Sequence, residues 1–325
     1  MKLAALVVTG VLCLGAQKGA TSPLVDSGRR IPQARAFPAC AGAGPYWPTM
    51  TLALNGKSAW IACKEQARLL RINLANGRKT ASVKVPGAVI AVTSGLGSVW
   101  ALDTGSTLYR LNARTGRVTK RIALGAVAAY NIWIGGGSIW VADDQGARVI
   151  RVSPATNRVS ARITVSDGPS DMVFAGTRAW VINHRDSTLF SVDMTTNTAT
   201  RLATVGQEAA ERMVYLEGSL WVTGRGTPLL QVDPESGETL RSIDIGGAGI
   251  DIAVAAGSLW IPVRSAAVDR TGFPTMTALR RVTTAGAVTT AATARGRVDV
   301  HGVAGGSGAV WLADNTDGFL YRIPT

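Results

Sequence analysis

Short stretches in which apolar and polar residues alternate recur along almost the whole chain. One interval shows the pattern clearly, with alternating segments at 131–134, 138–143, 148–152 and 158–165. Alternation with a period of two is typical of β-strands that bury one face. Glycines 135–137 separate the first two segments and suit a tight hairpin turn. This interval is therefore predicted to form a four-stranded antiparallel unit.

Seven tryptophans mark the same position of this unit along the chain, near the start of its second strand. They are Trp60, Trp100, Trp140, Trp180, Trp221, Trp260 and Trp311, at intervals of 40, 40, 40, 41, 39 and 51 residues. Trp47 and Trp133 fall outside this register. A repeat of about 40 residues with four strands has the size of one propeller blade. The pattern predicts an all-β, seven-bladed β-propeller with four-stranded blades, in which the seven tryptophans pack between blades.

The two ends of the chain suggest how the ring closes. The last repeat stops at 320–325, after its third strand, and no fourth strand follows. Residues 28–37 resemble the fourth strand of the second repeat. The N-terminal segment is therefore predicted to close the ring as the outer strand of the seventh blade. The long final interval between tryptophans predicts an insertion around 264–276, between the second and third strands of blade 6.

The first twenty residues have the pattern of a secretion signal. Lys2 precedes an apolar run, Leu3 to Ala16, which is too short to span a bilayer. We expect a signal peptide at 1–20, a single propeller domain at 21–325 and a secreted or periplasmic protein without a transmembrane segment. Cys40 and Cys63 then remain in the mature chain, which favours a disulfide over two buried thiols in an oxidising compartment.

The third repeat also resembles a known family. It reads Trp140-Val141-Ala142-Asp143, Val149-Ile150-Arg151-Val152, Thr156-Asn157-Arg158-Val159 and Ile163-Thr164-Val165, and it is similar to a YVTN-type propeller repeat. The same pattern resembles the blades of streptogramin (virginiamycin B) lyase-like propellers. The resemblance covers residues 28–325 and implies the seven-bladed fold. It says little about function, because propellers host many chemistries.

Polar residues gather at one predicted face of the ring. In a propeller, the first strand of each blade starts at the channel mouth, and ligands favour such concave sites. These starting positions are apolar in blades 1 and 2 and polar in blades 3 to 7. The predicted ligand-binding residues are Tyr130, Asn131, Asp171, His184, Arg212, Asp251 and Asp299. We expect a small ligand or a protein partner there, and an ordinary solvated rim is the alternative.

A second hypothesis follows from the lyase resemblance. Those lyases remove a proton α to a cyclic ester with histidine, glutamate and a divalent metal. Here His301-Gly302-Val303 precedes a strand that ends at Asp314, where the family has glutamate, and only this blade has the histidine. The resemblance implies catalytic roles for His301, Asp314 and Glu211. Because the set is incomplete, we expect a non-catalytic binding protein without a cofactor, and a metal-assisted lyase is the alternative.

The chain is strongly basic, with 34 Lys and Arg against 21 Asp and Glu and a formal net charge of +13. The basic residues recur on the predicted third strands (Arg71, Arg110, Arg151, Arg322) and fourth strands (Arg117, Lys120, Arg121, Arg158, Arg162, Arg201, Arg241). Such charges protect strand edges or dock the ring on an anionic surface. Nucleic acid ranks third among the partners, because aromatic residues are only 6% and most tryptophans are committed to packing. A monomer is expected.

Overall fold

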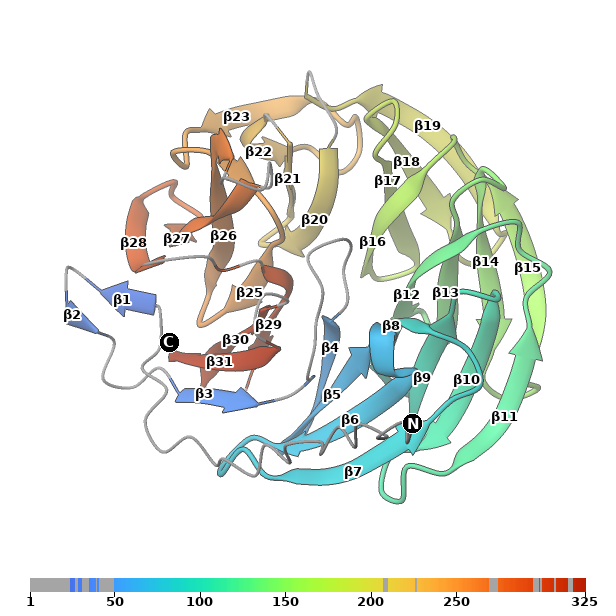
Figure 1. Ribbon diagram of the computed structural model, residues 1–325. Helices are drawn as coiled ribbons and strands as arrows, with labels where there is room; N and C mark the ends of the chain where they lie inside the picture. Colours follow the sequence, from blue (N-terminus) through green and yellow to red (C-terminus); the bar gives the residue numbers. More distant parts are fainter. Residues whose placement is uncertain are drawn as a thin grey trace, which may run out of the picture.

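The computed structural model is a ring of seven antiparallel sheets around a central axis (Figure 1). It describes residues 24–26, 29–30, 35–38, 40, 50–206, 210–225, 227–268, 274–294, 298, 300–306, 308–314 and 318–325. The predicted signal segment, 1–20, lies outside these residues. Within the described ranges, no helix is long and apolar enough to cross a membrane. The predicted all-β, seven-bladed architecture is confirmed.

The first four blades contain four strands each, ordered from the innermost strand beside the axis to the outermost (Figure 1). Blade 1 has β4 (Met50–Asn55), β5 (Ser58–Cys63), β6 (Arg68–Asn73) and β7 (Lys79–Lys84). Blade 2 has β8 (Val89–Gly95), β9 (Ser98–Asp103), β10 (Thr107–Asn112) and β11 (Val118–Ala123). Blade 3 has β12 (Ala129–Gly135), β13 (Ser138–Asp143), β14 (Arg148–Ser153) and β15 (Arg158–Thr164), and blade 4 has β16 (Pro169–Ala175), β17 (Arg178–Asn183), β18 (Thr188–Asp193) and β19 (Thr198–Thr204).

The last three blades keep this plan with changes at the end of the chain. Blade 5 has β20 (Ala210–Leu216), β21 (Ser219–Gly224), β22 (Thr227–Val232) and β23 (Thr239–Ile243). Blade 6 has a divided inner strand, β24 (Ala248–Gly249) and β25 (Ala253–Ala255), followed by β26 (Ser258–Val268), β27 (Pro274–Thr283) and β28 (Val288–Ala294). Blade 7 has β29 (Val300–Gly306), β30 (Ala309–Asp314) and β31 (Phe319–Pro324). The predicted insertion in blade 6 mostly lengthens two paired strands, since Val268 is still opposite Pro274.

The N-terminal segment closes the ring, as predicted, but its strands are shared between blades 6 and 7. Only β3 (Arg35–Pro38) is the outer strand of blade 7, where it pairs antiparallel with β31. Upstream, β1 (Leu24–Asp26) pairs with β28 and, with β2 (Arg29–Arg30), extends the edge of blade 6. The prediction that 28–37 forms one outer strand is therefore corrected. Similarity to a fourth strand cannot show which of two neighbouring exposed edges each part of the segment will meet.

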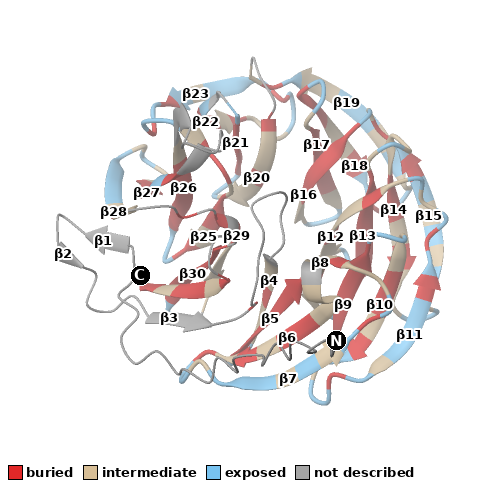
Figure 2. Cartoon of the chain, in the orientation of Figure 1, coloured by how far each residue is buried: buried red, intermediate tan, exposed pale blue. Residues whose placement is uncertain are grey.

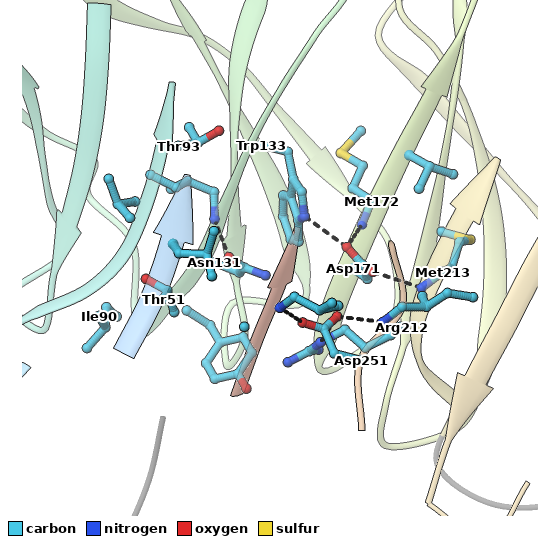
Figure 3. A pocket seen from close by; sticks show the side chains of 18 of the residues that line it. Thr51, Ile90, Thr93, Asn131, Trp133, Asp171, Met172, Arg212, Met213 and Asp251 are labelled. Atoms are coloured by element: carbon cyan, nitrogen blue, oxygen red, sulfur yellow. Dashed lines mark hydrogen bonds and ion pairs between the residues drawn. The ribbon is translucent and has the colours of Figure 1, made fainter. Parts of the chain in front are cut away.

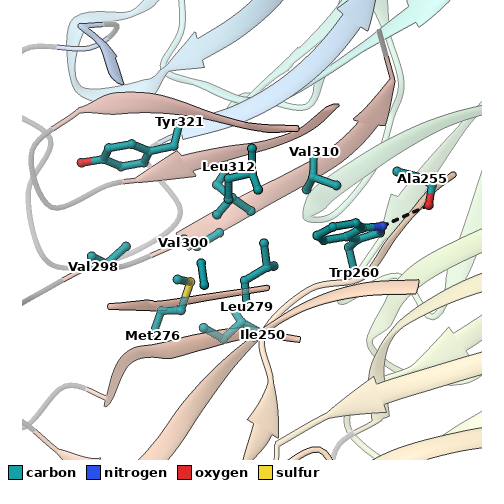
Figure 4. Close-up of a cluster of buried hydrophobic side chains, with 12 residues drawn as sticks. Ile250, Ala255, Trp260, Met276, Leu279, Val298, Val300, Val310, Leu312 and Tyr321 are labelled. Atoms are coloured by element: carbon teal, nitrogen blue, oxygen red, sulfur yellow. Dashed lines mark hydrogen bonds between the residues drawn. The ribbon is translucent and has the colours of Figure 1, made fainter. Parts of the chain in front are cut away.

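Each hydrophobic core lies between two neighbouring blades. Between blades 6 and 7, for example, Trp260 and Leu279 pack in one cluster with Val310, Leu312 and Tyr321 (Figure 4). Buried residues concentrate in the inner three strands of the blades, while the outermost strands are largely exposed (Figure 2). The repeat tryptophans thus have the packing role that the sequence predicts. A rigid ring of this kind holds the inner strand ends at fixed positions around the axis.

The arginines of the third strands connect adjacent blades. Arg110 donates from Nε to Ser98 Oγ at 2.9 Å, lies 5.1 Å from the Trp100 ring centre, and donates from Nη1 to the Pro154 carbonyl of the next blade at 2.7 Å. Arg71 and Arg151 make the same two kinds of hydrogen bond, and Arg322 lies over Trp311. A guanidinium suits this role because its planar fork stacks and donates together.

Blade 5 keeps the contact with an arginine from another strand. Gln231 takes the usual arginine position on the third strand, and Arg241 lies directly opposite it on β23. Arg241 lies 5.7 Å from the Trp221 ring centre and donates to the carbonyls of Thr284 and Ala285 in blade 6. The sequence predicted edge protection or docking on an anionic surface for these arginines, and the structure adds hydrogen bonds across blade boundaries. Their cation is used between blades.

Cys40 and Cys63 form the predicted disulfide bond, with their Cα atoms 5.7 Å apart and both side chains buried. The Cys40 N–H also donates to the Gly318 carbonyl of blade 7 at 3.1 Å. The bond thus fastens the residue after the closing strand to blade 1. Because it closes a loop of 23 residues, its removal is expected to lower the free energy of unfolding by about 3 kcal/mol.

Thermal unfolding with and without a thiol reductant tests this expectation. Reduction should lower the melting temperature of the parent protein and leave a double Cys40→Ala, Cys63→Ala variant unchanged. An equal response of both proteins would show that the reductant acts elsewhere, and no response of either would contradict a stabilising bond.

Candidate functional site

A cavity of about 470 Å³ lies at the centre of the ring, and all seven blades contribute to its wall (Figure 3). Its lining comes mostly from the starts of the inner strands, the positions that the sequence analysis assigned to the channel mouth. The lining residues are Thr51, Leu52, Lys64, Ile90, Val92, Thr93, Tyr130, Asn131, Ile132, Trp133, Asp171, Met172, Val173, Arg212, Met213, Asp251, Ile252, Gly302 and Val303. Of the predicted ligand-binding residues, Tyr130, Asn131, Asp171, Arg212 and Asp251 therefore share one cavity.

Irregular pairing of the inner strands sets the direction of these side chains. The register between first and second strands shifts at 89–91, 129–132, 169–171, 210–212 and 300–302. A β-bulge of this kind bends the strand and re-aims the neighbouring side chains. The bulge occurs at the same point in five blades, at the first residues of the inner strand. The bulges thus present residues of the strand start to the cavity.

Asp171 joins three blades through its carboxylate. Its Oδ1 accepts from Trp133 Nε1 at 2.9 Å and from the Met172 N–H at 2.8 Å, and its Oδ2 accepts from the Met213 N–H at 2.8 Å. Burial raises the pKa of Asp171 to about 6, although the charge of Arg212 and the hydrogen bond from Met213 act in the opposite direction. Asp171 thus holds donors of its own blade and of both neighbouring blades at the wall of the cavity.

Asp251 repeats this arrangement between blades 6 and 7. Its Oδ1 accepts from the Ile252 N–H at 2.9 Å, and its Oδ2 accepts from the Val303 N–H at 3.0 Å. Asn131 has the same sequence position in blade 3, and its Oδ1 accepts from Ile132. Both cavity aspartates therefore use their oxygens to hold main-chain N–H groups of their own and the next blade.

Arg212 is the partly buried cation of the site, with its side chain 21% exposed. Its Nε lies 3.8 Å from Asp251 Oδ1, and its Nη1 donates to the Glu211 carbonyl at 3.0 Å. Burial by itself lowers the pKa of Arg212, but Tyr130, Asp251, Asp171 and Glu211 outweigh it and raise the pKa above the ordinary value. The guanidinium has five donors, and these contacts engage only part of them within the described structure. It therefore stays charged and keeps donor capacity beside the cavity.

The cavity has more donors to offer than acceptors. Besides Arg212, its wall includes Tyr130, Lys64 and the amide group of Asn131. The buried Thr51 hydroxyl also has no hydrogen-bond partner among the described residues. The rest of the wall is apolar and comes largely from Leu52, Ile90, Val92, Met172 and Met213. A ligand that complements this surface has an acceptor-rich or anionic end and an apolar body.

Three other predicted site residues, Glu211, His184 and Asp314, do not line this cavity. Glu211 is paired through Oε1 with Arg225 Nε at 2.7 Å, and the His184 Nδ1 is 2.8 Å from the Gly168 carbonyl oxygen. Asp314 is completely buried at the end of β30 and does not line the cavity. The backbone of His301 belongs to β29, but its side chain lies outside the described residues, as does the whole of Asp299.

Position explains the burial of Asp314. The corresponding aspartate of blade 3, Asp143, accepts hydrogen bonds from the N–H groups of Val127 and Ala128 and pairs with Arg148 Nε at 2.8 Å. In blade 3, the aspartate at the end of the second strand therefore holds the loop between blades. The lyase resemblance implies a catalytic role for Asp314, and the structure places this residue, fully buried, at the corresponding position of blade 7.

Several lining residues were not singled out from the sequence. Trp133 is the most important of them, because its indole donates to Asp171 from the neighbouring blade. Its signal was present, since it is a tryptophan outside the register of the seven core tryptophans. Lys64 and Thr51 carried no such signal, because each is a common surface residue type.

The divalent metal implied by the lyase resemblance does not fit the aspartates of this cavity. Both carboxylates accept main-chain N–H groups, and the Arg212 cation stands between them. No cluster of three or more His, Cys, Asp or Glu side chains suited to a metal occurs among the described residues. We therefore derive no chemical step through a metal.

Comparisons with known proteins show the fold. No protein-family profile and no curated protein sequence matches this chain. Virginiamycin B lyase from Staphylococcus aureus superposes with a TM-score of 0.73 at 17% identity, over 90% of this chain and 99% of that one. Hydrazine synthase from Kuenenia stuttgartiensis gives 0.70 at 12% identity over 88% and 98%, and BamB from Moraxella catarrhalis gives 0.60 at 11% over 84% and 82%.

These similarities confirm the seven-bladed propeller and its likeness in fold to the streptogramin lyase. All three identities are low, and the three proteins have different names and tasks. A shared propeller does not transfer a function. The function of this chain therefore depends on the residues of its own cavity.

Proposed function

We propose that this chain is a binding propeller whose central cavity holds a small amphipathic ligand with an anionic or carbonyl-rich end. One observation carries the proposal. The partly buried Arg212 cation lines the cavity with donors that its contacts do not use, beside carboxylates that already accept hydrogen bonds. Hydrogen bonds to a charged group contribute about 1.5–3 kcal/mol each. An acceptor group of the ligand would therefore contribute most to the binding free energy if it accepted hydrogen bonds from Arg212.

The apolar part of the wall favours a ligand whose other end is apolar. Leu52, Ile90 and Val92 belong to blades 1 and 2, while Arg212 and Asp251 belong to blades 5 and 6. Apolar side chains of blades 1 and 2 therefore face a charged pair in blades 5 and 6, while Thr51 and Lys64 add polar groups on the side of blade 1. Burial of apolar ligand surface contributes roughly 25 cal/mol per Å². An amphipathic molecule satisfies both sides in one orientation, which would provide selectivity.

We also propose that the protein works outside the cytoplasm. The Cys40–Cys63 bond supports this, because disulfides persist mainly in oxidising compartments. Residues 1–20 remain a predicted signal peptide.

A pair of fluorescent probes tests the ligand class. Anilinonaphthalene sulfonate has an apolar body and an anionic group, and N-phenylnaphthylamine is its uncharged analogue. We expect one sulfonate to bind per chain, at least tenfold more tightly than the neutral probe, which is the scale of one charge-assisted hydrogen bond. Ile90→Trp should fill the cavity and weaken the sulfonate at least tenfold, measured by fluorescence titration.

Val127→Trp is the matched control, because Val127 is 65% exposed and lies outside the cavity lining. It adds the same ring without occupying the site, so sulfonate binding should be unchanged. Equal affinity for both probes would contradict the role of Arg212. Equal loss in both tryptophan variants, or binding that survives Ile90→Trp, would place the probe elsewhere.

The lyase hypothesis remains the alternative, supported by the likeness in fold to virginiamycin B lyase. Of its three predicted catalytic residues, Glu211 is paired with Arg225 and Asp314 does not line the cavity. Ring opening of a streptogramin lactone by the purified protein with Mg²⁺, lost in His301→Ala, would overturn a purely binding role. We expect no turnover.

A further inference from the structure

The positive charge of this chain is concentrated in one part of the ring. Residues 68–165 contain fourteen Lys and Arg against three Asp and no Glu, a difference of +11. Residues 166–325 contain thirteen Lys and Arg against sixteen Asp and Glu, a difference of −3. Residues 1–67 contain seven Lys and Arg against two Asp and Glu, a difference of +5, which completes the total of +13. The largest excess therefore belongs to blades 1 to 3.

The exposed part of this charge lies on three consecutive outer strands. The strands β7, β11 and β15 follow one another along the outer circumference of the ring (Figure 1). On these strands and the turns before them, nine basic residues are exposed: Arg78, Lys79, Lys84, Arg114, Arg117, Lys120, Arg121, Arg158 and Arg162. We call these nine residues the basic rim.

Among the described residues, no acidic side chain pairs with the basic rim. The three acidic residues of this part of the chain are Asp103 and Asp143, which are buried, and Asp144, which pairs with Arg185 of blade 4. None of the ion pairs between described residues includes a residue of the basic rim. The stacked third-strand arginines contribute little, because their guanidinium groups are used between blades. The basic rim is thus a continuous field of uncompensated positive charge.

Protection of strand edges does not account for this distribution. Charged side chains on an edge strand do discourage pairing with other sheets. The outer strand β19 of blade 4 is also an edge, however, and it carries a single charged residue, Arg201. The charged residue of β23 is Arg241, which is stacked on Trp221. Edges on the other side of the ring therefore persist without such a cluster.

We infer that the basic rim binds a flexible linear polyanion by charge alone. The rim covers the convex side of the ring over three blades, which a flexible chain can follow, whereas a flat bilayer would touch only a part of it. The strands β7, β11 and β15 contain no aromatic residue. Base stacking, which single-stranded nucleic-acid sites use, is therefore absent from these strands. The polymer is recognised by its phosphate, sulfate or carboxylate charges, at a site separate from the central cavity.

Polyphosphate, heparin and single-stranded DNA, each fluorescently labelled, are the probes for this site, together with vesicles of an anionic phospholipid. We expect the three polymers to bind and the vesicles to bind weakly. Each contact with a single-stranded polyanion contributes about 0.7 to the slope of log affinity against log salt. Five contacts would thus weaken binding on the order of a hundredfold between 50 and 200 mM salt.

Two variants with the same change in net charge locate the site. Arg117→Gln with Lys120→Gln and Arg158→Gln removes three charges from the rim and should weaken polymer binding on the order of tenfold. Thr200→Glu with Thr239→Glu and Thr289→Glu adds three negative charges at exposed positions in blades 4 to 6 and should have little effect. A cooperative thermal unfolding transition in each variant would establish that both are folded.

Each of the other results would overturn the inference. Equal weakening in both triple variants would mean that only net charge matters. Vesicle binding stronger than polymer binding would assign the rim to membranes, and preference for one DNA sequence would indicate base readout. Aggregation of the Gln variant with unchanged polymer binding would show edge protection alone.

Discussion

Deletion of residues 21–38 is expected to lower the melting temperature on the order of 10 °C. The deletion removes β3 from the outer edge of blade 7 and β1 from that of blade 6. Both β31 and β28 then lose their outer partners, and the last blade is left with three strands. Because each blade is stabilised mainly by its neighbours, damage at the closure weakens the contact between the first and last blades. Calorimetry of the parent and deleted proteins measures the effect.

A shorter deletion separates the two contributions. Removal of residues 21–30 alone takes away β1 and β2 but leaves β3 paired with β31. We expect a smaller drop in melting temperature than with the longer deletion. Equal melting temperatures for the two deleted proteins would mean that the four residues of β3 add nothing to closure. A melting temperature of the longer deletion equal to that of the parent would mean that the ring does not depend on its N-terminal strand.

Replacement of Asp171 by alanine is expected to lower the free energy of unfolding by about 3–5 kcal/mol. The substitution leaves three donors without their acceptor, namely Trp133 Nε1 and the N–H groups of Met172 and Met213. It also removes a negative charge next to the partly buried Arg212. Asn131→Ala is the control, because Asn131 accepts a single hydrogen bond from its neighbour and should cost about 1 kcal/mol. Denaturant unfolding measures both, and equal losses would contradict the role of Asp171 as a junction.

The pH dependence of stability gives a second measure of the same group. Burial raises the pKa of Asp171 to about 6, above the value of about 3.9 in an unfolded chain. Between these pH values the native state binds more protons than the unfolded state, so stability falls as the pH rises. The contribution is fully present below about pH 4 and is lost as the pH passes about 6, by at most about 3 kcal/mol.

Asp171→Asn isolates this contribution, because the amide does not titrate. The stability of the parent relative to this variant should decline between pH 4 and 7 and then level off. Parallel stability curves for the two proteins would show that Asp171 has an ordinary pKa in the folded chain.

The sequence predicts much of the candidate site because its positions follow from the repeat. Asn131, Asp171 and Asp251 each stand nine residues before a core tryptophan, and the structure places all three on the cavity wall. Their interactions could not be predicted in the same way. Asp171 and Asp251 accept main-chain N–H groups 42 and 52 residues further along the chain. Those contacts depend on bulges at the strand starts, which leave little trace in the alternation of side chains.

By itself, the sequence determined the number of blades and, to within about two residues, the bounds of the four strands of blade 3. Alternation and turn residues are local, so the second strand of blade 3 is predicted at 138–143 and found as Ser138–Asp143. Only the tertiary structure decided which charges are free. The arginines of the third strands resemble surface residues in sequence, yet Arg110 reaches a carbonyl 44 residues away across the boundary between blades. The N-terminal segment likewise divides between two blades because two exposed edges lie within its reach. A repeat specifies each unit, but contacts between units arise only when the ring brings residues one period apart together.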